Sequence, residues 1–141
     1  CAPSPLREAM MKIHQYCMLC APIMSQMAGI EALKLGASAY EDMRQSYEQR
    51  RNLVVTRLNE MGLHCFNPGG AFYVFPDITS TGLTSKEFAF GLLEKKSVAV
   101  VPGNAFGSAG EGFVRCCYAT APELLKTAMD LMAEFVAEVR K

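Results

Sequence analysis

Two hydrophobic patterns divide this chain at Gly62. Before it, apolar residues recur at helical spacing in segments that open at serine or proline, and the second and third of these segments close at Gly36 and Gly62. After it, short apolar runs alternate with two further helical patterns. The order predicts helices first and then a β-β-α-β-β-α segment. Such a segment is expected to form an α/β sandwich of two layers, in which helices cover a small, mainly antiparallel sheet.

The boundaries of these elements follow from local signals. Ser4 is predicted to cap the first helix, and glutamate three residues after serine or threonine predicts capping boxes at Ser38, Thr84 and Thr120. The third helix has a polar middle around Gln49, as expected for a helix that packs at both ends and connects two parts of a protein. The helices are expected at 4–16, 23–35, 38–61, 84–95 and from 120 onward, and the strands at 64–66, 71–75, 98–101 and 113–118.

Charge and composition exclude several classes of protein. The 14 basic and 14 acidic residues balance, and no basic stripe indicates binding to nucleic acid or to a membrane surface. No apolar run approaches the roughly 20 residues that span a bilayer. The six cysteines are expected to be free, mostly buried thiols in a reducing cytoplasm, because no signal peptide is evident. Because the sequence starts abruptly at Cys1, we expect the chain to be a piece of a longer protein.

Arg115 is the residue that most directly suggests a binding site. It lies in the apolar run Phe113–Tyr118, where side chains alternate between the two faces of a strand. The strand itself holds no acid, and a guanidinium among apolar residues is costly unless an anion meets it. A carboxylate fits its planar fork best. The alternative is a solvent-exposed arginine on an edge strand, although flanking cysteines and aromatic residues make a poor solvated surface.

The other motifs are less specific. Gly69 and Gly70 precede an aromatic strand, where they either allow a ligand to approach the backbone or simply form a tight turn. The glycine-rich segment 107–112 leads into a strand and lacks the order of a dinucleotide-binding loop. Cys17 and Cys20 have metal-ligand spacing but no second pair, so no metal site is predicted. No catalytic set of residues can be argued from spacing.

Taken together, several segments resemble the C-terminal part of the class I/II aminotransferases, which are pyridoxal phosphate enzymes of fold type I. The resemblance covers essentially the whole chain. It is carried by Val100–Gly107, Gly112–Arg115 with Tyr118-Ala119, Gly69–Phe75, Ala21-Pro22 through Gln26, Ala32-Leu33, and Ala2-Pro3.

The resemblance implies a role for particular residues and regions. Arg115 corresponds to the arginine that holds the α-carboxylate of the amino-acid substrate, and Gly70, Ala71, Phe72 and Tyr73 correspond to a strand that lines the substrate pocket. Residues 1–37 would be helices from the end of the large cofactor domain, 38–61 the connector helix, and 62–141 the small C-terminal domain. Substrates would be an amino acid and a 2-oxo acid, and the family is usually homodimeric.

The resemblance also implies that the cofactor-binding lysine is absent from this chain. The lysine that binds pyridoxal phosphate lies upstream in the family, and no lysine of this chain sits in a matching motif (Lys12, Lys34, Lys86, Lys95, Lys96, Lys126 and Lys141). The chain is therefore predicted to be an inactive fragment, missing the N-terminal large domain, of an enzyme that transfers an amino group. Two alternatives are an aminotransferase-like effector-sensing domain of a transcription regulator and a C–S lyase of the same fold.

Overall fold

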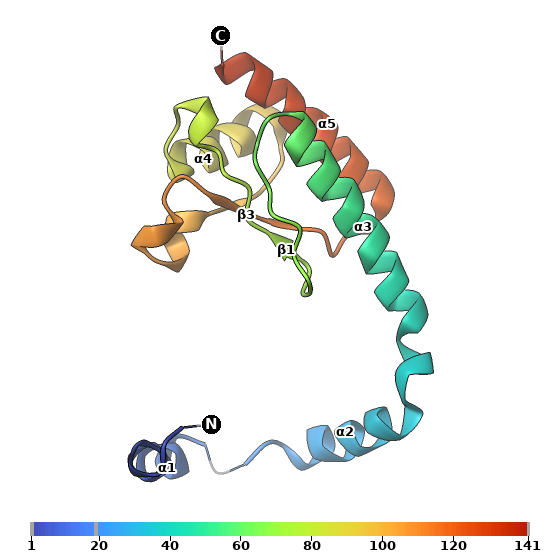
Figure 1. Cartoon of the computed structure of the whole chain (residues 1–141), viewed down its shortest axis with the longest axis vertical. Coiled ribbons are helices and arrows are strands. Elements are labelled where there is room, and N and C mark those ends of the chain that lie inside the picture. Colours follow the sequence, from blue (N-terminus) through green and yellow to red (C-terminus); the bar gives the residue numbers. More distant parts are fainter. Residues whose placement is uncertain (1, 19, 141) are drawn as a thin grey trace. The chain divides into compact units, whose positions relative to one another are not determined.

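The computed structural model describes residues 2–18 and 20–140 (Figure 1). The chain divides into two compact units, residues 1–42 and 43–141. The division falls near the start of helix α3 (Glu41–Glu60), so most of that helix belongs to the second unit. No helix in the described part is long and apolar enough to cross a bilayer.

The first unit consists of two helices and a short 3-10 turn. Helix α1 (Ser4–Cys17) includes Ser4 as its first residue, so Pro3 and not the predicted Ser4 is the N-cap, and Ser4 accepts a hydrogen bond from Arg7. Helix α2 (Ile23–Leu35) ends at Gly36, as predicted. Neither helix buries a residue. Their large exposed apolar side chains are Leu6, Met10, Met11, Ile13, Tyr16, Ile23, Met24, Met27, Ile30, Leu33 and Leu35.

Of the predicted capping boxes, the one at Thr84 forms and the one at Thr120 does not. Thr84 and Glu87 cap helix α4 (Ser85–Lys96) reciprocally, with each side chain bonded to the other residue's backbone N–H. Ser38 instead lies in the 3-10 turn Ala37–Ala39 and donates to the carbonyl of Leu35, because α3 begins only at Glu41. Helix α5 (Pro122–Val139) begins after Ala121, which puts Thr120 outside the capping position.

A three-stranded antiparallel sheet forms one layer of the second unit, as the predicted fold class requires. Strand β3 (Val114–Cys117) lies between β1 (Tyr73–Val74) and β2 (Val101–Pro102). Tyr73 pairs with Cys117, and Val101 pairs with Arg115. The outer strands are shorter than the predicted runs 71–75 and 98–101.

The predicted strand at 64–66 does not form, and Asn59 shows why. Its side-chain amide donates to the carbonyl of Cys65 at 3.1 Å and accepts from the N–H of the same residue at 3.1 Å. The amide therefore occupies both backbone groups that a neighbouring strand would use. The carbonyl of His64 accepts a single bond from the N–H of Asp77.

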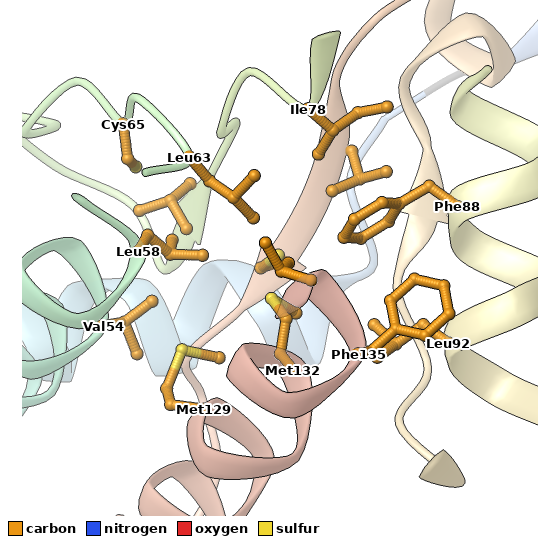
Figure 2. Close-up of a cluster of buried hydrophobic side chains, with 14 of the residues drawn as sticks. Val54, Leu58, Leu63, Cys65, Ile78, Phe88, Leu92, Met129, Met132 and Phe135 are labelled. Atoms are coloured by element: carbon orange, nitrogen blue, oxygen red, sulfur yellow. The ribbon is translucent and has the colours of Figure 1, made fainter. Parts of the chain in front are cut away.

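The core of the second unit lies where α3, α4 and α5 meet the inner face of the sheet (Figure 2). Helix α3 buries Val54 and Leu58, whereas Met43 near its start is exposed. On α4 and α5, Phe88 and Phe135 meet edge to face with ring centroids 5.3 Å apart. A Cβ on Gly91 would lie 3.0 Å from the Phe135 ring, so this glycine lets the two helices approach closely.

Replacing Phe88 by alanine should lower the free energy of unfolding by about 3–5 kcal/mol, because the Phe88 side chain is fully buried and its loss leaves a cavity. Chemical denaturation followed by circular dichroism measures the change. The control is Phe90→Ala on the same helix, where the side chain is 57% exposed and the cost should stay within about 0.5 kcal/mol. Equal losses for the two variants would contradict the packing described here.

Candidate functional site

Arg115 lies on the face of the sheet that points away from the core. Along β3, Val114, Cys116 and Tyr118 are buried, while Arg115 is only partly buried and Cys117 is exposed. The alternation of side chains along a strand explains this division, because the inner residues pack against the helices. The guanidinium is therefore carried by a strand whose other face is fixed in the core.

Two aromatic rings contact the guanidinium of Arg115. Its Cζ atom lies 4.3 Å from the centre of the Tyr73 ring and 4.6 Å from the centre of the Phe106 ring. Within residues 2–18 and 20–140, no carboxylate or other acceptor pairs with its N–H groups. The only buried, unpartnered side-chain nitrogen or oxygen found there is Nε of Arg50, so the Arg115 donors remain accessible to solvent. An accessible, unpaired guanidinium can bind an anion.

Phe106 belongs to a glycine-rich loop, residues 103–112, that runs from β2 to β3. Its backbone crosses itself closely at Gly103 and Gly110. A Cβ on Gly103 would lie 2.2 Å from the carbonyl oxygen of Gly110, and a Cβ on Gly110 would lie 2.1 Å from the oxygen of Gly103. Only glycine fits at either position without moving the backbone. The crossing holds the 3-10 turn Gly103–Phe106 beside the start of β3.

Glu111 attaches this loop to helix α4. Its Oε1 accepts from the backbone N–H of Ser85 at 2.8 Å, and its Oε2 accepts from the side chain of Asn104 at 2.5 Å. The hydrogen bond from the Ser85 N–H, at the positive end of α4, is the largest cause of a lowered pKa at Glu111. Ser85 adds a second connection, since its hydroxyl accepts from the N–H of Gly112 at 2.9 Å.

The remaining predicted substrate residues divide between two places. Gly70, Ala71 and Phe72 line a cleft of about 320 Å³, while Tyr73 contacts Arg115. The cleft backbone is held by Tyr118, whose hydroxyl donates to the carbonyl of Ala71 at 2.8 Å, and Ala71 adopts a positive φ of 61°. Arg115 does not line this cleft, which is completed by Arg44, Tyr47, Glu48, Arg51, Gly69 and Tyr118.

The cysteines do not supply a nucleophile in the core. Burial raises the pKa of Cys65 to about 11 and that of Cys116 to about 12, so both remain protonated thiols at neutral pH. The described cysteines are free, but the prediction that most are buried is wrong. Cys17, Cys20 and Cys117 are exposed. The described residues contain no group of three or more potential metal ligands.

The sequence patterns do not identify Phe106 or Glu111 as site residues. Both lie in or beside the motifs that carry the family resemblance, but neither spacing nor hydrophobicity indicates that the loop folds back onto Arg115. The paired glycines at 103 and 110 were the available signal, because two glycines that flank a short loop permit its backbone to cross.

The comparisons with known proteins decide the family. The profile of the family "Aminotransferase class I and II" matches residues 1–131, which is most of the chain. The chain belongs to the class I and II aminotransferase family. Its Arg115 and its loop at 103–112 are therefore features of an aminotransferase chain.

Individual aminotransferases are similar to this chain over nearly its whole length. YugH of Bacillus subtilis, an aminotransferase by name, is 56% identical over 135 residues, which are 96% of this chain and 35% of YugH. Aspartate aminotransferase of Pyrococcus abyssi is 52% identical, over 97% of this chain and 36% of its own. The crystal structure of the aromatic aminotransferase of Pyrococcus horikoshii superposes with a TM-score of 0.84 at 50% identity, covering 97% of this chain. The chain thus spans about a third of the length of these relatives.

Removing the Glu111 charge should change how stability depends on pH. Because folding lowers its pKa below the usual 4.5, the carboxylate stabilises the fold above that pH, and this contribution is lost as the pH falls through the lowered value. Glu111→Gln should therefore reduce the loss of stability between about pH 6 and about pH 3. Denaturant unfolding at both pH values measures the loss.

The matched control for this experiment is Glu94→Gln. Glu94 is an exposed carboxylate on α4 with no hydrogen bond recorded among the described residues. Its variant should keep the acid sensitivity of the unmodified chain. An unchanged pH dependence in Glu111→Gln would show that the contacts to Ser85 and Asn104 do not stabilise the fold.

Proposed function

We propose that this chain is the C-terminal part of a pyridoxal-phosphate-dependent aminotransferase, in which Arg115 binds the α-carboxylate of the substrate. The observation that carries the proposal is the guanidinium of Arg115, which is partly buried, accessible and without an acidic partner in the described part of the chain. A carboxylate would supply the missing acceptors through two parallel hydrogen bonds. The reaction would transfer an amino group between an amino acid and a 2-oxo acid.

The role of Arg115 in that reaction is to orient the substrate. Two parallel hydrogen bonds from the planar guanidinium to the carboxylate fix both the position and the orientation of the amino acid. Positioning of this kind lowers a reaction barrier. The strand behind Arg115 cannot shift easily, because Val114 and Cys116 are buried in the core. Pyridoxal phosphate, when bound, supplies the electron sink for the chemistry.

The lysines in the described part of this chain do not fit a role in holding that cofactor. Lys96 pairs with both Glu134 and Glu138, and Lys34 pairs with Glu31. No lysine lines the cleft at Gly70 or contacts Arg115 in the described part of the chain. We therefore place the cofactor-binding lysine in a segment outside this sequence, and we assign no step through the cofactor to the residues here.

The same proposal gives each region a place in a longer protein. Residues 1–37 would complete a large cofactor domain, 38–61 would connect the domains, and 62–141 would form the small domain. The exposed apolar side chains of α1 and α2 support this arrangement, since helices that bury nothing need a partner surface. We further propose a homodimer, located in the cytoplasm, where free exposed thiols such as Cys17 persist.

We prefer the function of an aminotransferase to that of a lyase or of a transcription regulator with the same fold. Each of the three relatives compared above bears the name of an aminotransferase. Their names differ in substrate, with aspartate for one and aromatic amino acids for another. The proposal therefore extends to the reaction and to the shared α-carboxylate, and leaves the substrate side chain open.

Arg115→Lys should raise KM for the amino acid by about 10- to 100-fold in the longer protein, because an ammonium cannot form the bidentate pair. Steady-state kinetics over a range of amino-acid concentrations measures the effect. Arg57→Lys is the control, since Arg57 pairs with Asp130 on the outside of the helices and lysine can keep that ion pair. An unchanged KM in Arg115→Lys would refute the assignment.

The 141-residue chain on its own should not catalyse transamination, because it lacks an amine suited to the cofactor. Formation of 2-oxo acid is measured with the chain, pyridoxal phosphate and an amino acid. The rate should equal that of pyridoxal phosphate and the amino acid without protein. A clearly higher rate would show that one of the lysines here acts as the cofactor amine.

A further inference from the structure

The Phe106 ring is unusually placed for a large apolar side chain. It is 54% exposed, yet its ring contacts two other side chains. It meets the Phe75 ring edge to face with centroids 5.6 Å apart, and it lies 4.6 Å from the Cζ atom of Arg115. Its backbone ends the 3-10 turn Gly103–Phe106 in the loop before β3 (orange in Figure 1). A ring fixed this firmly at the surface indicates a function beyond filling space.

Arginine side chains are flexible, and immobilising one when a ligand binds costs entropy. A guanidinium that already lies against aromatic rings has lost much of that freedom before the ligand arrives, so a preorganised Arg115 binds its anion more tightly. The rings do not compete with the ligand, because they engage the guanidinium through their π electrons and leave its N–H donors unpaired.

We propose that Phe106 is a positioning residue that holds the guanidinium of Arg115 ready for the substrate carboxylate. The inference rests on the function proposed above and adds a residue that acts through Arg115. Tyr73 provides the second ring, but it belongs to β1 and pairs with Cys117, so its replacement would also disturb the sheet. Phe106 lies outside every strand, which makes it the cleaner residue to change.

The loop that carries Phe106 is built to keep the ring in place. The close crossing of Gly103 and Gly110 fixes its two ends against each other, and the N–H of Gly103 donates to the carbonyl of Phe113 at 2.8 Å. Glu111, near the end of the loop, accepts from the N–H of Ser85 on α4 and from the side chain of Asn104, near the start of the loop. The position of the Phe106 ring is thus set by backbone contacts that a change of side chain at 106 leaves intact.

The test replaces the ring by an aliphatic side chain in the longer protein. Phe106→Leu should raise KM for the amino acid by about tenfold, as expected for the loss of one cation–π contact, and should leave kcat within about twofold. Phe106→Tyr keeps a ring and should restore the original KM. Phe106→Met serves as a second variant without a ring. The matched control is Phe90→Leu, because Phe90 is equally exposed at 57% and contacts no cation among the described residues.

A spectroscopic readout on the 141-residue chain checks the contact without any enzyme assay. Ring currents from Tyr73 and Phe106 act on the Nε–H proton of Arg115. Its resonance should therefore shift in Phe106→Leu and stay near its original position in Phe106→Tyr and Phe90→Leu. A resonance that does not move in Phe106→Leu would overturn the proposed contact.

The kinetic outcomes separate this inference from the proposed function. If Arg115→Lys leaves KM unchanged, the carboxylate role of Arg115 fails and the positioning role fails with it. If Arg115→Lys raises KM while Phe106→Leu and Phe106→Met do not, only the positioning role is overturned. A fall in kcat with constant KM in Phe106→Leu would also overturn it, because Phe106 would then act on the chemical step and not on binding.

Discussion

The alternation of side chains along strand β3 is the constraint on which the rest of the structure depends. Val114, Cys116 and Tyr118 enter the core, and Arg115 lies between them on the opposite face. Because β3 is the central strand, it is fixed by backbone pairing on both sides and by three helices behind it. A slip of one residue would bury the guanidinium and expose the core, so the register is strongly determined.

Around this strand, the site is assembled from segments that are distant in the sequence. Tyr73 reaches Arg115 from β1, and Phe106 reaches it from the loop before β3. That loop is fastened by Gly103 against Gly110 and by Glu111 at the start of α4. The cation is thereby held by aromatic contacts, which constrain it without neutralising it, and this is the property that an anion-binding site needs.

The predicted elements form where the signal is local, and they do not form where a competing contact occupies the same backbone groups. The helix at Thr84 has the predicted capping box, whereas Ser38 and Thr120 do not occupy the N-cap position, because α3 and α5 start elsewhere. The run of residues 64–66 indicates a strand, but the side chain of Asn59 is hydrogen-bonded to the backbone N–H and carbonyl of Cys65. Such contacts come from residues several positions away, and no periodicity reveals them.

The sequence by itself determined the class of fold, the outward direction of Arg115 and the family to which the chain belongs. Each of these follows from periodicity or from a contiguous motif. Only the tertiary structure decided what surrounds the guanidinium among the described residues, namely two rings and no acid, with Gly70, Ala71 and Phe72 grouped around a separate cleft. The physical reason is that the path of a glycine-rich loop depends on close backbone packing and long-range hydrogen bonds, which exist only once the chain has folded.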